Sequence, residues 1–553
     1  MKRKPTLPEI RLHYNKGRSV YSLSKALRKQ GYKFSKAWMT GQVQKLKDAR
    51  EAQRISAIDA TVNRMMDGYR QDKLEGTIES ADRRRGKTNA KTLLFTSAQS
   101  NTKVHAAFLA TLESFCRHRD AELHIAQFTY NKATHGASSV KPGSKKATDT
   151  QKLWYDEAIA PYVSNGSIQL TRDLVWCGEL NILPTMKNPL TQFQTYTRQD
   201  SAIIPHAKMM MQSVPTMKEM PPKFLYTTGC VTQRNYIQKT SGQVADFHHV
   251  FGAMLVEIDD DGTWWARQIN ATNDGSFYDL HEYFTPDGRV EQLQRVEALT
   301  HGDIHYQKRD PDVLAAVFGP DGVVDALSPK LQFIHDLIDF TPRNHHNIKD
   351  PHFWHQMHVE GSSKVEEEFM GAGKFLTEWV DRIDSNTYVI TSNHDQAIEQ
   401  WLRDTSSLFD PPNVMFWHHM NLYCHIMREH GFVPRPFGYA VLRSVGHAAI
   451  KRLTVLHEDE SFLICDSIEA GLHGHLGPNG ARGNPKNLRT VGKANTAHTH
   501  SAGIFEGVYT AGVYGKLDMG YNKGLSGWSH SMIVTYKNAK RAILTIKKGR
   551  AWR

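Results

Sequence analysis

Residues 295–305 read Arg295-Val296-Glu297-Ala298-Leu299-Thr300-His301-Gly302-Asp303-Ile304-His305, so a short apolar segment leads directly into a carboxylate and an imidazole. Asp303 and His305 stand two residues apart, which places both side chains on the same side of an extended chain. Both could therefore hold one metal ion. Polar residues that follow buried strands gather at the carboxyl ends of the strands in α/β sheets, so this segment predicts an α/β fold with a site at that edge.

Four further polar clusters occur along the chain, and the first three of them follow apolar segments in the same way. They are Asp336-Leu337-Ile338-Asp339 after 331–335, Asn393-His394-Asp395 after 388–390, His473-Gly474-His475 after 462–465, and Ala497-His498-Thr499-His500. Histidine is concentrated here, because 19 of the 29 histidines lie between His301 and His500. Each cluster alone is a weak signal, since core histidines bonded to nearby carboxylates give the same pattern. Five in succession favour one metal centre.

In this order the clusters resemble the calcineurin-like metallophosphoesterase superfamily, whose pattern is D-x-H, G-D-x-x-D, G-N-H-[DE], a single histidine and G-H-x-H. The resemblance covers roughly residues 290–535, and three glycines of the pattern are replaced, by His335, Ser392 and Ala497. It implies an α/β fold of the four-layer metallophosphoesterase type, a β-sandwich flanked by helices. We expect this domain to span residues 291–553.

The resemblance also implies a site of two divalent metal ions. Asp303, His305 and His500 would hold one ion, Asn393, His473 and His498 the other, and Asp336 would bridge them, with His475 as the alternative to His473. Oxygen and imidazole ligands without thiolate suit Mn²⁺, which we expect by analogy with nucleases of the superfamily, and Fe²⁺ or Zn²⁺ are alternatives. His394 is left free to donate a proton to the leaving group, and Asp339 would orient it.

Positive charge is concentrated at the N-terminus of the chain. The first 87 residues carry an excess of 13 positive charges, whereas the whole chain carries +12. Apolar residues at helical spacing from Val20 end at Gly31, and Ser35 can cap a second helix, so a helix-turn-helix is predicted, with a plain helical hairpin as the alternative. The candidate DNA contacts are Lys33, Lys36, Lys45, Lys47 and Arg50.

Residues 88–290 predict an α+β region whose role the motifs do not reveal. A strand-helix-strand unit is expected over 91–128 and a β-hairpin over 253–269, while no phosphate-binding glycine motif and no internal repeat is evident. This region could cap the site or build a homo-oligomer interface. The five cysteines form no C-x-x-C pair, and no apolar run could span a bilayer, so we expect a reduced, cytoplasmic protein without a membrane partner.

These features favour a metal-dependent nuclease that hydrolyses DNA phosphodiester bonds by a two-metal mechanism. The chain as a whole also resembles the pre-early first-step-transfer proteins of Tequintavirus-like phages, to which destruction of host DNA is attributed. Two alternatives stay open. A phosphomonoesterase or protein phosphatase of the same superfamily would use the same metals, and a non-catalytic DNA-binding regulator would explain the basic N-terminus but not the seven ligands.

Overall fold

The computed structural model describes residues 3–14, 20–49, 52, 86–130, 154–344, 347, 349–404 and 409–553. The chain divides into two compact units, Met1–Arg84 and Arg85–Arg553. Each unit has its own hydrophobic core. Among the described helices, none combines the length and the apolarity that a membrane crossing needs.

The first unit contains the predicted pair of helices. Helix α1 spans Leu7–Tyr14, α2 spans Val20–Lys29, and residues 36–49 are also helical. Gly31 follows α2 with a φ of 94°, and the Ser35 hydroxyl accepts the backbone N–H of Trp38 at 3.1 Å, so both predicted helix-end signals are confirmed. A small core holds the helices together (Ile10, Leu23, Leu27, Met39, Val43 and Leu46).

The lysines that were expected to contact DNA are exposed in this unit. Lys33 lies in the turn before the last helix, and Lys36, Lys45 and Lys47 lie on that helix. Arg50, the fifth candidate, lies outside the described residues. The exposed lysines therefore remain available as contacts for a polyanion.

A six-stranded sheet carries the first three polar clusters. Its order is β17-β16-β15-β14-β23-β24, in which β14 to β17 run parallel, β23 is antiparallel to β14, and β24 is antiparallel to β23. The strands are β14 (Ala298–Thr300), β15 (Leu331–His335), β16 (Asn386–Ile390), β17 (Leu453–Leu456), β23 (Ser531–Thr535) and β24 (Arg541–Thr545). Every residue of β23 and β24 is buried, as expected for strands that are covered on both faces.

Three more sheets complete the second unit. The eleven-stranded sheet has the order β1-β4-β5-β6-β8-β7-β21-β22-β20-β19-β18, the four-stranded sheet β10-β9-β2-β3, and the three-stranded sheet β11-β12-β13. The first half supplies β1 (Gly86–Lys87), β2 (Thr92–Gln99), β3 (Glu122–Phe128), β4 (Ser167–Thr171), β5 (Leu174–Cys177), β6 (Ser201–Ile204), β7 (Met211–Val214), β8 (Lys223–Thr227), β9 (Gly252–Ile258), β10 (Trp264–Asn270), β11 (Phe277–Asp279), β12 (Glu282–Phe284) and β13 (Val290–Gln292). The second half adds β18 (Leu463–Ile464), β19 (Ile468–Glu469), β20 (Ala494–Thr496), β21 (Gly503–Phe505) and β22 (Val508–Thr510).

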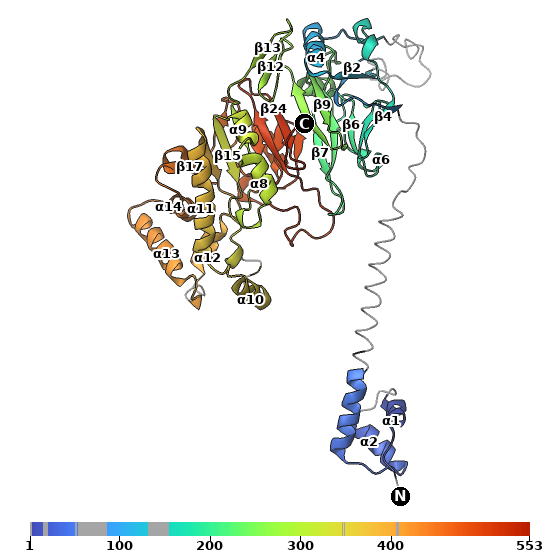
Figure 1. The fold of residues 1–553 in the computed structure, drawn as a ribbon, viewed down its shortest axis with the longest axis vertical. Helices are drawn as coiled ribbons and strands as arrows, with labels where there is room; N and C mark the ends of the chain where they lie inside the picture. The colour runs from blue at the N-terminus through green and yellow to red at the C-terminus, as the bar shows by residue number, and fades with distance from the viewer. Residues whose placement is uncertain are drawn as a thin grey trace. The chain divides into compact units, whose positions relative to one another are not determined.

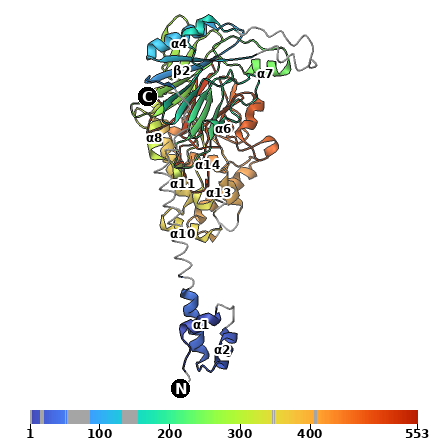
Figure 2. The same ribbon diagram turned by 90° about the vertical axis from the view of Figure 1, so that its right-hand side faces the viewer.

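The sheets pack face to face. Strand β10 lies beside β24, where the Gln268 side chain accepts the Ile543 N–H at 2.8 Å and the Asn270 amide donates to the Arg541 carbonyl at 2.7 Å. The four- and six-stranded sheets thus adjoin, and both face the eleven-stranded sheet (Figures 1 and 2). Two clusters of buried apolar side chains fill the space between them. A mixed α/β architecture is confirmed.

Helices cover the outer faces of the two adjoining sheets (Figure 1). The helices of the second unit are α4 (Ala106–Arg119), α6 (Phe193–Tyr196), α7 (Thr240–His248), α8 (Pro311–Phe318), α9 (Val323–Leu327), α10 (Pro351–Val359), α11 (Val365–Arg382), α12 (Ala397–Arg403), α13 (Val414–Glu429) and α14 (Pro436–Ser444). Of these, α6 packs on the eleven-stranded sheet and α7 packs beside Tyr130 and Tyr236. Helix α11 shows why: Val365, Phe369, Ala372, Leu376 and Trp379 recur at helical spacing and are buried against the six-stranded sheet.

The connectivity of the second unit occurs twice. Strands β14, β15 and β18 to β24 pair with one another in the same order and the same directions as β2, β3 and β4 to β10. Strand β1, which pairs with β4, has no counterpart beside β18 among the described residues. We call residues 92–270 the first copy and residues 298–545 the second copy. Only the second copy contains β16 and β17 with the helices around them.

The two copies meet at the centre of the eleven-stranded sheet, where β7 pairs with β21 through Gln212 with Gly503 and Met211 with Ile504. Ranges 88–290 and 291–553, expected as separate domains, therefore share one sheet and one core. Residue 290 does not separate two compact units. The expectation that the sequence holds no repeat is wrong at the level of connectivity.

Candidate metal centre

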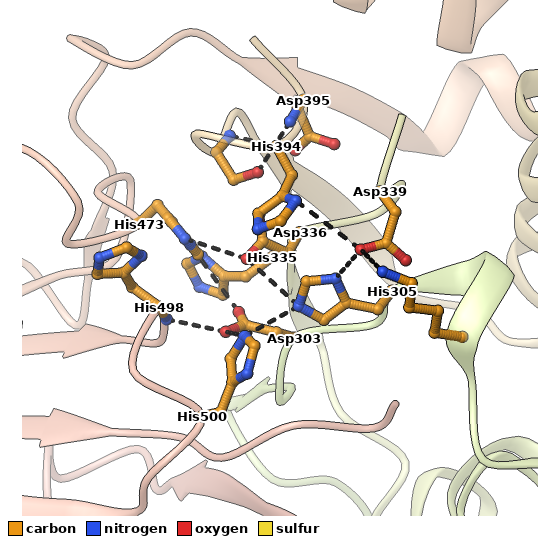
Figure 3. Close-up of polar contacts among 12 residues, drawn as sticks. Asp303, His305, His335, Asp336, Asp339, His394, Asp395, His473, His498 and His500 are labelled. Atoms are coloured by element: carbon orange, nitrogen blue, oxygen red, sulfur yellow. Dashed lines mark hydrogen bonds and ion pairs between the residues drawn. The ribbon is translucent and has the colours of Figure 1, made fainter. Parts of the chain in front are cut away.

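Strand ends from both large sheets build the site. Asp303 and His305 follow β14, Asp336 and Asp339 follow β15, and Asn393 and His394 follow β16. Since these three strands are parallel neighbours, the residues that follow them meet at one edge of the sheet. His473 follows β19, while His498 and His500 follow β20, so the opposing sheet supplies the remaining histidines (Figure 3).

Four buried side chains lie close enough to hold one ion. Asp303, His305, Asp336 and His500 each offer a ligand atom within 4.8 Å of the others. Nε2 of His500 is 3.2 Å from Oδ2 of Asp303, and Nε2 of His305 is 3.6 Å from Oδ2 of Asp336. The structure thus brings together the three ligands expected for one metal and the carboxylate expected to bridge (Figure 3).

Two of the other expected ligands, His473 and His498, lie beside this group. Nε2 of His473 is 3.4 Å from Oδ2 of Asp336, and the ring of His498 packs 5.1 Å from that of His473. The backbone N–H of His498 donates to Oδ2 of Asp303 at 3.0 Å. His473 therefore faces the bridging carboxylate, and the ring of the alternative, His475, lies 5.4 Å from the His473 ring.

Asp339 pairs differently from the expectation. Its Oδ1 lies 2.9 Å from Nδ1 of His305 but 3.8 Å from Nδ1 of His394. The carboxylate thus orients a metal-ligand candidate first, and His394 is its more distant neighbour. His305, Asp339 and His394 also form a second group within ligand distance.

Many buried polar atoms of the site have no hydrogen-bond partner among the described residues. They include Oδ1 of Asp303, Oδ1 of Asp336, Oδ1 of Asn393, Nδ1 of His394 and Nδ1 of His500. Unpaired buried polar atoms destabilise a protein, and buried carboxylates require a compensating charge. Oxygen and imidazole atoms are the donors that bind divalent cations, so these residues fit the expected metal ions.

The backbone is unusual at the same residues. His305, Asp336, His498 and His500 have φ angles of 45°, 43°, 76° and 56°, in the left-handed region that side chains other than glycine rarely adopt. Such conformations cost free energy and cluster at functional sites, where the surrounding structure enforces them.

Charge within the site is tightly coupled. Burial lowers the pKa of His305, but the carboxylates of Asp339, Asp336 and Asp303 outweigh it and raise this pKa to about 9. Burial lowers the pKa of His498 to about 4, and the nearby His473 adds to that effect. The carboxylates thus favour positive charge at His305.

Two further residues of the site, Asp395 and His335, were not predicted from the sequence. Asp395 is buried and accepts the backbone N–H groups of Ser392 at 3.1 Å and Ile338 at 3.3 Å, which ties the loops after β15 and β16 together. The last position of the G-N-H-[DE] pattern was the available signal for it. His335 lies 3.3 Å from His473, measured between Nδ1 atoms, where the pattern has glycine.

Protein A1 of Escherichia phage T5 is 38% identical to this chain over 488 residues, which cover 86% of the chain and 85% of protein A1. No protein-family model matches the chain, and no solved structure matches it.

Proposed function

Because the chain belongs to the family of protein A1 of Escherichia phage T5 and is a T5-like phage protein, we propose that it is a metal-dependent nuclease that degrades host DNA during infection. The proposal includes a calcineurin-like metallophosphoesterase fold. Two sheets packed face to face, with helices outside and polar clusters at the strand ends, support that assignment.

The observation that carries the proposal is the buried group of Asp303, His305, Asp336 and His500 with His473 against it. Two divalent ions bound there would lower the pKa of a water and stabilise both the attacking and the leaving oxygen at phosphorus. Asp303, His305 and His500 would hold one ion and Asn393, His473 and His498 the other. Asp336, whose Oδ2 faces both His305 and His473, would bridge them.

His394 is suited to move a proton at the leaving group. Its side chain is 20% exposed, whereas His305 and His473 are fully buried, so it can reach a bound substrate. Asp339 at 3.8 Å would stabilise the protonated imidazole. His394 is therefore assigned as the proton donor, and Asp339 as a positioning residue shared with His305.

DNA is the proposed substrate because a polyanion requires a cationic surface as well as a metal centre. The first unit exposes Lys33, Lys36, Lys45 and Lys47 on one turn and one helix. A small phosphomonoester would need no such unit, and a regulator would need no buried metal ligands.

The test is to incubate supercoiled plasmid and linear DNA with the full chain in Mn²⁺, Mg²⁺ or EDTA, and to repeat it with Asp336→Asn. We expect metal-dependent cleavage that EDTA and the substitution abolish. Turnover of p-nitrophenyl phosphate without cleavage of DNA would identify a phosphomonoesterase instead. Binding of DNA without any hydrolysis would identify a regulator.

A further inference from the structure

The first copy keeps a histidine at one of the two positions that follow β20 in the second copy and has a lysine at the other. His498 and His500 stand two and four residues after β20, and His206 and Lys208 stand two and four residues after the equivalent strand β6. Nζ of Lys208 donates to the carbonyl of Met186 at 2.7 Å. A protonated ammonium has no lone pair for a metal, so the first copy has no ligand at this position.

The first copy instead supports a segment beside the metal centre of the second. Thr216, in the loop after β7, forms a backbone bridge with Ser526, with N···O distances of 2.9 and 2.8 Å. Nζ of Lys218 lies 2.8 Å from Oδ1 of Asp518. Residues 516–528 are thus attached at both ends to the other copy.

This segment presents aromatic rings next to a metal-ligand candidate. The ring of Trp528 packs against His500 with centroids 4.3 Å apart, and Tyr521 packs on Trp528 at 5.8 Å. Nζ of Lys308 lies 4.7 Å from the centre of the Tyr521 ring and 3.8 Å from Oδ1 of Asp339. We call Trp528, Tyr521 and Lys308 the aromatic rim.

The rim is accessible and its surroundings are basic. Tyr521 is 46% exposed, and Lys516 and Lys523 on the same segment are exposed as well. An exposed ring with cations around it is the arrangement that binds single-stranded nucleic acid, because bases stack on the ring and lysines contact phosphates.

We propose that the first copy is an inert partner of the second, and that it holds the aromatic rim as a stacking surface for a nucleobase of single-stranded DNA adjacent to the scissile phosphate. The proposal rests on the proposed function, since a nucleobase is expected there only if DNA is the substrate. It adds that the site would accept single-stranded DNA, and it gives residues 92–270 a role.

The test measures binding of a fluorescent single-stranded oligothymidylate to the full chain in EDTA, where cleavage does not occur. Tyr521→Ala should weaken binding about tenfold, because removing a stacking ring costs roughly 1–3 kcal/mol per base. Tyr521→Phe should bind as the wild type does. Phe247→Ala, which removes a ring that is 82% exposed on α7, is the matched control and should change nothing.

The role of the first copy is tested with a charge exchange. Lys218→Asp and Asp518→Lys should each weaken binding about threefold, since each places like charges together, and the double exchange should restore it. Melting temperature and bound metal are measured on every variant to confirm folding. Unchanged binding in Tyr521→Ala overturns the stacking role, and a double exchange that fails to restore binding overturns the supporting role. If the wild type hydrolyses a chromogenic ester but neither binds nor cleaves DNA, the proposed function itself fails.

Discussion

Nδ1 of His305 lies 2.9 Å from Oδ1 of Asp339, while Nε2 of the same ring lies 2.9 Å from Nε2 of His500. A carboxylate can only accept, so Nδ1 carries the proton and Nε2 is presented toward Asp303, Asp336 and His500. This tautomer is the one that ligates a metal through Nε2. Asp339 therefore selects the state of His305 that the site requires.

Asp339→Asn should weaken metal binding about 10- to 100-fold, because partners that orient ligating histidines typically contribute that much. The asparagine amide has the size of the carboxylate, but it can present its NH₂ group, which does not accept a hydrogen bond, to Nδ1 of His305. Calorimetric titration of the metal-free chain with Mn²⁺ measures the effect. An unchanged dissociation constant would show that Asp339 does not act through His305.

Asp336→Ala and Asp303→Ala should each abolish DNA hydrolysis and reduce the bound metal. Each removes an anionic ligand from a site whose other ligands are mostly neutral imidazoles, and Asp336 faces His305 and His473 together. Metal analysis of the purified variants checks this, with Asp384→Ala, at an exposed carboxylate, as control. Two metals bound to an active Asp336→Ala variant would reject the bridging role.

His394→Ala should slow cleavage of DNA about 10²–10⁴-fold while retaining the metals and the affinity for DNA. The loss should be smaller for a p-nitrophenyl diester, whose leaving group scarcely needs a proton. Rates on both substrates and the metal content of one preparation decide the matter. Loss of metal would instead make His394 a ligand, as its position near His305 and Asp339 allows.

Replacing Lys33, Lys36, Lys45 and Lys47 together by alanine should weaken binding of duplex DNA and flatten its dependence on salt. Each lost phosphate contact should lower the slope of log affinity against log salt by about 0.9. Binding is measured from low to physiological salt in EDTA. Lys374→Ala with Lys451→Ala, which removes exposed lysines of the other unit, is the control, and an equal change in it would reject a dedicated DNA-binding surface.

His206 should make the protein less stable in acid. Burial lowers its pKa to about 3, and its Nδ1 accepts the backbone N–H of Lys208 at 3.0 Å, which protonation would break. Between pH 6.5 and 3 the unfolded chain binds this proton and the folded chain does not, so the free energy of unfolding falls as the pH falls.

His206→Asn keeps an acceptor near the Lys208 N–H but cannot titrate. Its melting temperature should therefore decrease less than that of the wild type when the pH is lowered from 7 to 4.5. Parallel melting curves in matched buffers measure the difference. Identical pH profiles would show that His206 does not contribute to acid sensitivity.

Local rules were sufficient for part of this structure. Gly31 and Ser35 delimit two helices, because a left-handed residue and a side-chain cap act on their immediate neighbours. Asp303, Asp336 and Asn393 each follow an apolar strand, and parallel strands place such residues at one edge whatever lies between them. The sequence alone therefore indicated which side chains would gather.

Only the tertiary structure decided how those side chains pair and what the rest of the chain contributes. Three contacts join residues that are far apart in sequence, so no rule of local spacing predicts them. They are the hydrogen bond of Asp339 with His305, the packing of Trp528 on His500, and the backbone bridge from Thr216 to Ser526. The sequence also carried no signal of the repeated connectivity. A sandwich requires only apolar residues buried on its inner faces, so Lys208 can stand where the second copy has a histidine while every strand keeps its neighbours.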